Sequence, residues 1–301
     1  MKWKEILLVF LVVVLVGLLA LYWFYPVDGF HNVVGFGNSN FSIDSAGMNS
    51  MQFYENMRYP EKEISYRIDS SCTLQKKDDA ERAFDIIENK TVLTFYSVNT
   101  NEEIHIACDD KNLVQGGLFV AGEGGPTNIT KAGSFNVITH GEVLLIKDSK
   151  CPNPNVAIHE ILHSLGFDHS ANANNIMYNI SNCKQEIGEQ IPFVVETLYS
   201  LPAQPDLTFE DVVYEMNNRY MNINMSVRNN GFKRANPSEI IIYVDNSEIK
   251  RIDLQSLNIG EGMKMMLVNL LLKQITIDEI KFEISYSGEE LDKENNIVIL
   301  S

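Results

Sequence analysis

The feature that most restricts how this chain can fold is a group of three histidines between His159 and His169. His159 and His163 are four residues apart, about 40° around a helix, so their imidazoles leave adjacent turns in the same direction. Asn155 is expected to cap this helix, and Gly166 is expected to end it in the left-handed conformation. The chain can then turn back and bring His169 to the other two. The spacing therefore predicts three convergent imidazoles.

This arrangement suits a metal ion. Two histidine nitrogens at this spacing can each lie about 2.0–2.1 Å from one Zn²⁺, and three such ligands leave one coordination position open. Glu160 is rotated by about 100° from His159, so its carboxylate is expected beside the metal rather than on it. There it can take a proton from an attacking water and hand it to a leaving amine. We therefore predict His159, His163 and His169 as zinc ligands and Glu160 as the general base.

Coincidence is the competing interpretation for the first half of this pattern, because H-E-x-x-H alone also arises by chance. Gly166 and His169 extend it to H-E-x-x-H-x-x-G-x-x-H, which lowers the chance about a thousandfold. A metal site is therefore favoured over histidines that merely share a helix.

The extended motif resembles that of the metzincin metallopeptidases, which have a methionine turn downstream. The segment "NNIMYN" provides such a turn at Met177, eight residues after His169. Within that clan, "LGFDHS" followed by "IMY" is most similar to the matrixins. The resemblance implies an α+β fold, with a mixed five-stranded sheet and an active-site helix, over residues 53–201. It also implies one catalytic Zn²⁺ and cleavage within protein or peptide substrates.

The same resemblance assigns further roles. Met177 would form a hydrophobic floor beneath the metal, and Tyr178 would hold the turn near the specificity pocket. The glycine-rich segment 117–127 is located where the family has the edge strand that pairs with substrate. No cysteine lies between the apolar N-terminus and Cys72, so the cysteine switch of matrixins is not expected.

Three features of the sequence lie outside the matrixin motif. Asn179 replaces the proline that usually follows the Met-Tyr pair. The other histidines, His31, His105 and His140, are interpreted as ordinary surface or strand residues rather than as a second zinc site. The acidic pairs 109–110 and 289–290 are interpreted as solvated turns, with a structural Ca²⁺ left open.

The N-terminus carries an apolar run of membrane-spanning length. From Ile6 to Tyr25 no residue is charged, which is enough to cross a bilayer as a helix. Lys2 and Lys4 precede the run, so the positive-inside rule places the N-terminus in the cytoplasm and the rest of the chain outside. The run ends in bulky "LYWFY" without a small-residue cleavage pattern. We therefore favour a single-pass signal anchor, residues 1–25, in the cell membrane over a cleaved and secreted form.

The cysteines fit an exported protein. Cys72, Cys108, Cys151 and Cys183 contain no C-x-x-C, which excludes a zinc ribbon or a thioredoxin-type motif. Four cysteines allow three pairings. We predict Cys72–Cys108 and Cys151–Cys183, because each pair closes one compact region.

Charge excludes one class of partner. The chain has 24 basic and 40 acidic residues and a formal net charge of −16. Such a surface repels nucleic acid, and no cluster of lysine and arginine opposes this conclusion.

The rest of the chain divides into segments that differ in composition and in the pattern of apolar residues. Residues 26–52 are rich in Gly, Asn and Ser, which indicates a juxtamembrane linker. Helices are expected at residues 78–90 and 191–201. From Leu207 onward, about seven short alternating strands predict an all-β immunoglobulin-like sandwich over residues 205–301. The segments "PDLTF", "VRNNG" and "ENNIVIL" resemble CARDB-like modules, which implies a spacer or a contact with a surface partner.

The sequence thus predicts a membrane-anchored zinc endopeptidase. Two alternatives stay open: a catalytically silent surface-binding protein with a structural zinc, and a carboxypeptidase or amidase with a similar zinc centre. Metal content without activity would favour the first, and the position of cleavage within a peptide would identify the second.

Overall fold

The computed structural model describes residues 51–110, 120–148, 150–273 and 277–300, together with the short pieces 3, 11–16, 33–35, 114–115 and 118–119. The expected membrane span falls mostly outside this set, although residues 11–16 are helical. Among the residues just named, no helix is both long enough and apolar enough to cross a bilayer.

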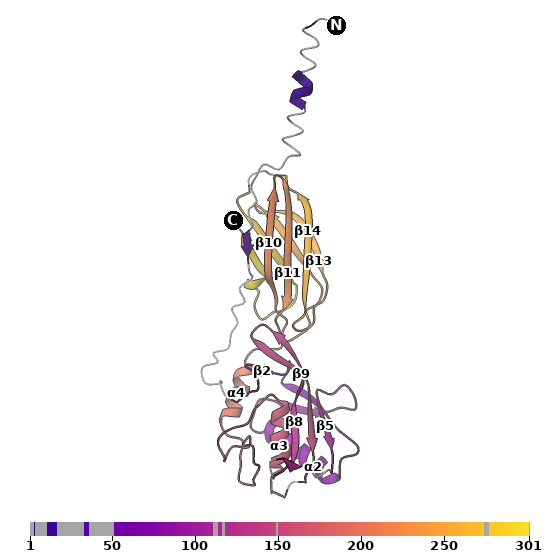
Figure 1. Ribbon diagram of the computed structural model, residues 1–301, viewed down its shortest axis with the longest axis vertical. Coiled ribbons are helices and arrows are strands. Elements are labelled where there is room, and N and C mark those ends of the chain that lie inside the picture. The colour runs from indigo at the N-terminus through magenta and orange to yellow at the C-terminus, as the bar shows by residue number, and fades with distance from the viewer. Residues whose placement is uncertain are drawn as a thin grey trace.

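The first folded unit is a mixed sheet packed against helices, as expected for an α+β fold (Figure 1). Its strands are β2 (Met57–Arg58), β3 (Glu63–Ile68), β4 (Thr94–Ser97), β5 (Ile104–Cys108), β8 (Gly122–Ala132) and β9 (Phe135–Leu145). The order is β2-β9-β5-β3-β4, with β8 on the other side of β9. Only β8 is antiparallel to its neighbour. The predicted five strands are therefore joined by a sixth, the two-residue β2. Strands β6 (Val114–Gln115) and β7 (Leu118–Phe119) pair separately.

Two helices differ in extent from the prediction. Helix α2 (Leu74–Glu88) begins four residues earlier than expected, because the Thr73 hydroxyl caps it by accepting a hydrogen bond from the Lys76 amide. Helix α4 (Gln190–Leu198) ends three residues early. The carbonyls of Leu198 and Leu201 accept hydrogen bonds from the buried Arg58 guanidinium instead of continuing the helix.

The second folded unit is an all-β sandwich with its own apolar core. One sheet has the order β1-β10-β11-β14 and the other β13-β12-β15-β16. The bounds are β10 (Leu207–Asn217), β11 (Tyr220–Asn229), β12 (Ser238–Val244), β13 (Ser247–Leu254), β14 (Gly262–Leu271), β15 (Ile280–Ser285) and β16 (Ile297–Leu300), with the short helix η1 (Glu294–Asn296) before β16. Alternating apolar side chains fill the space between the sheets, as the sequence pattern predicts.

Strand β1 (Val33–Gly35) belongs to this sandwich, although it precedes the first unit in the sequence. It pairs antiparallel with β10, with Val33 opposite Tyr214 and Gly35 opposite Val212. Part of the segment expected to be a linker therefore forms an edge strand.

The two units are joined by a buried contact. Arg58 is 2% exposed, and its guanidinium lies 4.3 Å from the ring centre of Tyr199 and 4.0 Å from that of Phe232 in the sandwich. Phe232 also packs edge-on against Phe135 of β9, with ring centres 4.8 Å apart. Burial lowers the pKa of Arg58 to about 10, which still leaves the guanidinium charged at neutral pH. The junction is thus packed like a core.

Candidate metal centre

Helix α3 (Asn155–Ser164) carries the first two histidines and is buried at every residue except the half-buried Val156. Its first residue is Asn155, and Pro154 occupies the capping position, so the predicted cap is wrong. The Asn155 side chain instead donates hydrogen bonds to the carbonyls of Asn182 (2.8 Å) and Gln185 (3.3 Å) and ties down a distant loop. Gly166 has φ +94°, and a β-carbon there would lie 2.9 Å from that of Met57, so glycine is required at this turn.

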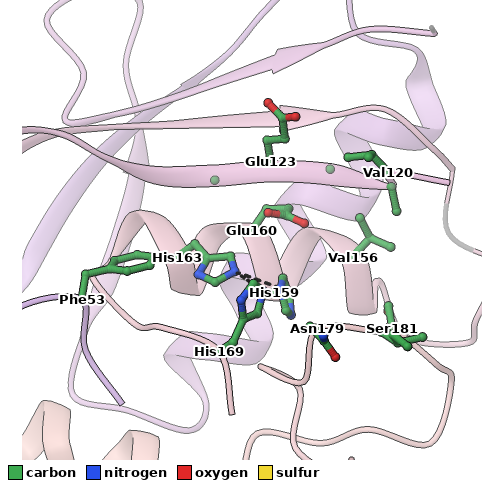
Figure 2. Close-up of a pocket in the computed structure, with 14 residues that line it drawn as sticks. Phe53, Val120, Glu123, Val156, His159, Glu160, His163, His169, Asn179 and Ser181 are labelled. Atoms are coloured by element: carbon green, nitrogen blue, oxygen red, sulfur yellow. Dashed lines mark hydrogen bonds between the residues drawn. The ribbon is translucent and has the colours of Figure 1, made fainter. Parts of the chain in front are cut away.

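The three histidines converge as predicted (Figure 2). Nε2 of His163 lies 3.0 Å from Nε2 of His159 and 3.2 Å from Nε2 of His169. Nitrogens on a tetrahedral zinc, each about 2.0–2.1 Å from the ion, are about 3.4 Å apart. The observed spacing is therefore close to that of a zinc site.

The hydrogen bonds of the other ring nitrogens decide which tautomers are present. Nδ1 of His159 lies 2.7 Å from the carbonyl oxygen of Ile176, and Nδ1 of His163 lies 2.7 Å from that of Phe167. A carbonyl oxygen only accepts, so both Nδ1 atoms carry the proton, and each Nε2 directs a lone pair at its neighbour. Lone pairs at this distance repel each other, and a shared cation offsets the repulsion.

Burial keeps these imidazoles neutral. The pKa of His163 is lowered to about 4, and burial is the largest cause. The neighbouring His159 is the second cause. Burial also lowers the pKa of His159. Neutral imidazole is the form that binds a metal, so the donor set fits Zn²⁺.

Glu160 lies beside the histidine group and not within it, as predicted. It is 7% exposed. Burial, with a smaller effect from the charge of Glu123, raises its pKa to about 8. A carboxyl group in such an environment is suited to take up and release a proton.

Strand β8 runs directly over Glu160 because two of its residues lack side chains. A β-carbon at Gly122 would lie 2.6 Å from Cγ of Glu160, and one at Gly124 would lie 2.2 Å from its backbone oxygen. Sequence reasoning did not recognise these two positions, although the alternating glycines of "GEGG" were the available signal. Within the described sheet, β8 pairs with β9 alone, so the predicted edge strand is confirmed.

The methionine turn is connected to the histidine loop. The Ser170 amide donates to the Met177 carbonyl at 2.8 Å, and Tyr178 forms a bridge with Ser170. Met177 is fully buried, and its amide donates to Oδ1 of Asn175 at 2.8 Å. The role of Met177 as a floor and that of Tyr178 near a pocket stay predictions.

A cleft of about 680 Å³ opens over the histidines. At one end the Phe53 ring stacks on His163, with ring centres 5.5 Å apart. The cleft is also lined by Val120, Val156 and Ile180, and Figure 2 places Val120 and Val156 on the opposite side of Glu160 from Phe53. Phe53 was not predicted as a site residue, because only the fold brings it to the cleft.

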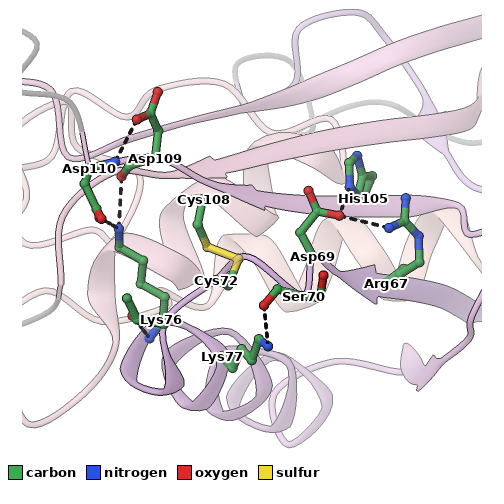
Figure 3. The surroundings of a disulfide bond; sticks show 11 residues. Arg67, Asp69, Ser70, Cys72, Lys76, Lys77, His105, Cys108, Asp109 and Asp110 are labelled. Carbon is green, nitrogen blue, oxygen red and sulfur yellow. Dashed lines mark hydrogen bonds and ion pairs between the residues drawn. A yellow bond between two sulfur atoms is a disulfide. The ribbon is translucent and has the colours of Figure 1, made fainter.

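Both predicted disulfides are confirmed. Cys151–Cys183 joins the segment before α3 to the loop after the methionine turn. Cys72–Cys108 joins the segment before α2 to the end of β5 (Figure 3).

Several other predicted residues have local partners outside the cleft. Near the Cys72–Cys108 disulfide, Asp110 pairs with the buried Lys76 at 2.6 Å, so this acidic pair is not simply a solvated turn. His105 pairs with Asp69 at 3.1 Å, and Nδ1 of His140 lies 2.8 Å from the Thr127 hydroxyl. His31 lies outside the described residues.

The comparisons with known proteins agree with this geometry. Residues 51–193 match the model of the Astacin peptidase family. The matched part is somewhat less than half of the chain, and it contains the three histidines, Glu160 and Met177. Astacins are metzincin-type zinc metalloendopeptidases, so the match indicates zinc metallopeptidase activity on protein or peptide substrates. It does not single out the matrixins.

One solved structure that matches is the CARDB domain of a Pyrococcus furiosus protein in complex with di-metal ions. It is 21% identical, and the match covers 31% of this chain and 83% of that chain with a TM-score of 0.28. No curated protein matches the chain.

Proposed function

We propose that this protein is a zinc endopeptidase, anchored in the cell membrane by residues 1–25, with its active site outside the cytoplasm. The observation that carries the catalytic part is the convergence of three Nε2 atoms beside the buried Glu160, beneath the free edge of β8.

Each of these residues has a separate task in the proposed reaction. His159, His163 and His169 would hold the ion through Nε2. When bound, Zn²⁺ would polarise the scissile carbonyl and lower the pKa of a water molecule. Glu160 would accept the proton from the attacking water and deliver it to the leaving nitrogen. Met177 would support the histidines from below, inside the core.

The edge strand favours a substrate that binds as an extended peptide. A peptide can add to the side of β8 that faces away from β9 through main-chain hydrogen bonds, and the glycines at 122 and 124 keep that strand close to Glu160. A peptide bound in this way continues past the reacting bond in both directions, which favours endopeptidase over carboxypeptidase activity. The residues "LGFDHS" and "IMY" are the reason to propose a matrixin-like subtype.

The proposed location rests on the sequence and on the disulfides. The uncharged run 6–25 with Lys2 and Lys4 ahead of it supports an anchor with the N-terminus in the cytoplasm. Two disulfides suit an oxidising compartment. Protease added to intact cells should then degrade the peptidase unit, and full protection of that unit would refute this orientation.

The catalytic proposal is tested by the full-length protein loaded with zinc. We expect cleavage of casein and of internal bonds in a peptide library. Glu160→Gln should retain zinc and lose activity by about 10²–10⁴-fold. If the zinc-loaded protein cleaves no peptide, the silent surface-binding alternative is favoured instead. Removal of C-terminal residues one at a time would favour the carboxypeptidase alternative.

A further inference from the structure

A cluster of buried oxygen-bearing side chains lies where the sandwich begins, away from the zinc site. Its members come from the start of β10 and from the segment around η1. All are at least nine-tenths buried: Asp206 (0% exposed), Thr208 (3%), Glu290 (9%), Asn295 (0%) and Asn296 (5%). Glu290 was expected in a solvated turn, which is wrong because its carboxylate is directed at the backbone of β10.

Hydrogen bonds and adjacent positions in the chain link these five residues. Asp206 and Thr208 are two residues apart on extended chain, so both lie on the face opposite to Leu207, which enters the core. The Leu207 amide donates to Oε1 of Glu290 at 2.8 Å. This bond brings the Glu290 carboxylate to the start of β10.

The two asparagines approach from the other side of the group. Asn295 Nδ2 donates to Oδ1 of Asp206 at 3.0 Å, and Asn296 Nδ2 donates to Oε2 of Glu290 at 2.6 Å. Each amide nitrogen therefore donates to a carboxylate.

This group has more acceptors than donors. Four of its oxygens are buried without a hydrogen-bond partner: Oδ2 of Asp206, Oγ1 of Thr208, Oδ1 of Asn295 and Oδ1 of Asn296. Buried unpaired polar atoms are rare in folded proteins. Within the described part of the chain, neither Asp206 nor Glu290 forms an ion pair. Negative charge and unused lone pairs thus coincide, and a cation compensates both.

We propose that Asp206, Thr208, Glu290, Asn295 and Asn296 form a site for a hard divalent cation of the calcium class. Ca²⁺ binds six to eight oxygens from carboxylates, amide carbonyls and water at about 2.3–2.6 Å, in flexible geometry. The group offers only oxygen, whereas Zn²⁺ prefers nitrogen and sulfur ligands. The two metal sites therefore select different ions.

This cation site lies next to the junction between the sandwich and the peptidase unit. It joins the start of β10 to the segment that precedes β16, the first and last strands of the sandwich after the peptidase unit. The Asp206 carbonyl also accepts from the Asn230 amide at 2.7 Å, and Oδ1 of Asn230 accepts from the Gly133 amide in the β8–β9 turn at 3.1 Å. Calcium would thus stiffen the junction between the two units.

The test is a Ca²⁺ titration of the full-length zinc-loaded protein by isothermal calorimetry, together with thermal unfolding. We expect one Ca²⁺ per chain and a rise in Tm. Asp206→Asn should weaken Ca²⁺ binding at least tenfold, whereas Glu289→Gln, the same charge change at an exposed neighbour, should not. His169→Ala should lose zinc and keep Ca²⁺ binding, which separates this site from the peptidase centre.

A second variant keeps the proposal testable if Asp206→Asn does not fold. Asn295→Asp adds a carboxylate, so it should lower Tm without Ca²⁺ and bind Ca²⁺ more tightly than the wild type. A purely structural network would show only the loss of Tm. No Ca²⁺ heat and no Tm shift in the wild type would overturn the proposal. So would stabilisation by acid alone, which would mean that protons rather than a cation compensate the group.

Discussion

Gly124 of β8 lies so close to Glu160 of α3 that a β-carbon at position 124 would be 2.2 Å from the Glu160 carbonyl oxygen. The neighbouring Gly125 has open space at the same position, with no atom within 4 Å. Adjacent glycines in one strand therefore have different constraints, and only the first sets the distance between the edge strand and the proposed base.

Gly124→Ala should consequently push β8 away from α3. We expect a loss of about 1–3 kcal/mol in unfolding free energy, typical of overpacking, and at least a tenfold fall in kcat/KM. Gly125→Ala is the matched control and should change activity little. Denaturant unfolding and peptide cleavage measure both effects. Equal behaviour of the two variants would show that the close approach has no role in activity.

Removal of the metal should abolish activity reversibly. We expect a chelator to stop cleavage and added Zn²⁺ to restore it, because the imidazoles alone supply no electrophile. His169 is exposed, so His169→Ala should lose zinc affinity with little loss of metal-free stability, whereas His163→Ala in the core should lose both. Zinc analysis and metal-free unfolding curves test this contrast. Full zinc occupancy in His169→Ala would remove that residue from the ligand set.

The two disulfides should contribute similarly to stability and differently to activity. They close segments of similar length, with sequence separations of 36 and 32, so removal of either should cost roughly 3–4 kcal/mol. Of the two disulfides, Cys151–Cys183 is the one that ties the segment before α3 to the loop after the methionine turn. The Cys151→Ser/Cys183→Ser variant should therefore lose more kcat/KM, measured where both variants are folded, than Cys72→Ser/Cys108→Ser. The reverse order would contradict this assignment.

Acid should weaken the ion pair between Arg67 and Glu102, which do not line the cleft. The hydrogen bond from Arg67 lowers the pKa of Glu102 to about 2, and the two side chains are 2.6 Å apart. A lowered pKa means that this stabilisation is present above the ordinary value of 4.5 and is lost as the pH falls towards 2. The pair is near the surface, so its contribution should be at most about 1 kcal/mol.

Unfolding curves of the wild type and Glu102→Gln between neutral pH and pH 2 test this prediction. The difference between the two proteins should shrink as the pH falls. A constant difference across the range would show that Glu102 stabilises through packing rather than through its charge.

Much of the candidate site could be predicted from the sequence because its signals are local. The spacing of His159, His163 and His169 fixes their directions on one helix and turn, and the cysteine pairs follow from compact segments. Glu290 could not be placed, because its partner at Leu207 is 83 residues away. The misassigned cap at Asn155 has a similar cause: its side chain is used by a loop 27 and 30 residues later. Tertiary partners override local preference in both cases.

The pairing of β1 with β10 affects which substrates the cleft of a membrane-anchored protein could contact. Since β1 is antiparallel to β10, its first residue, Val33, lies towards the Asn217 end of β10, while the peptidase unit joins at the Leu207 end. The sandwich, although last in the sequence, would then be a spacer between the proposed anchor and the cleft. The eleven residues of β10, at about 3.4 Å each, would add roughly 35 Å to the distance between the membrane and the cleft. Bonds next to the bilayer would be out of range, and the natural targets would be chains that extend well above the lipid surface.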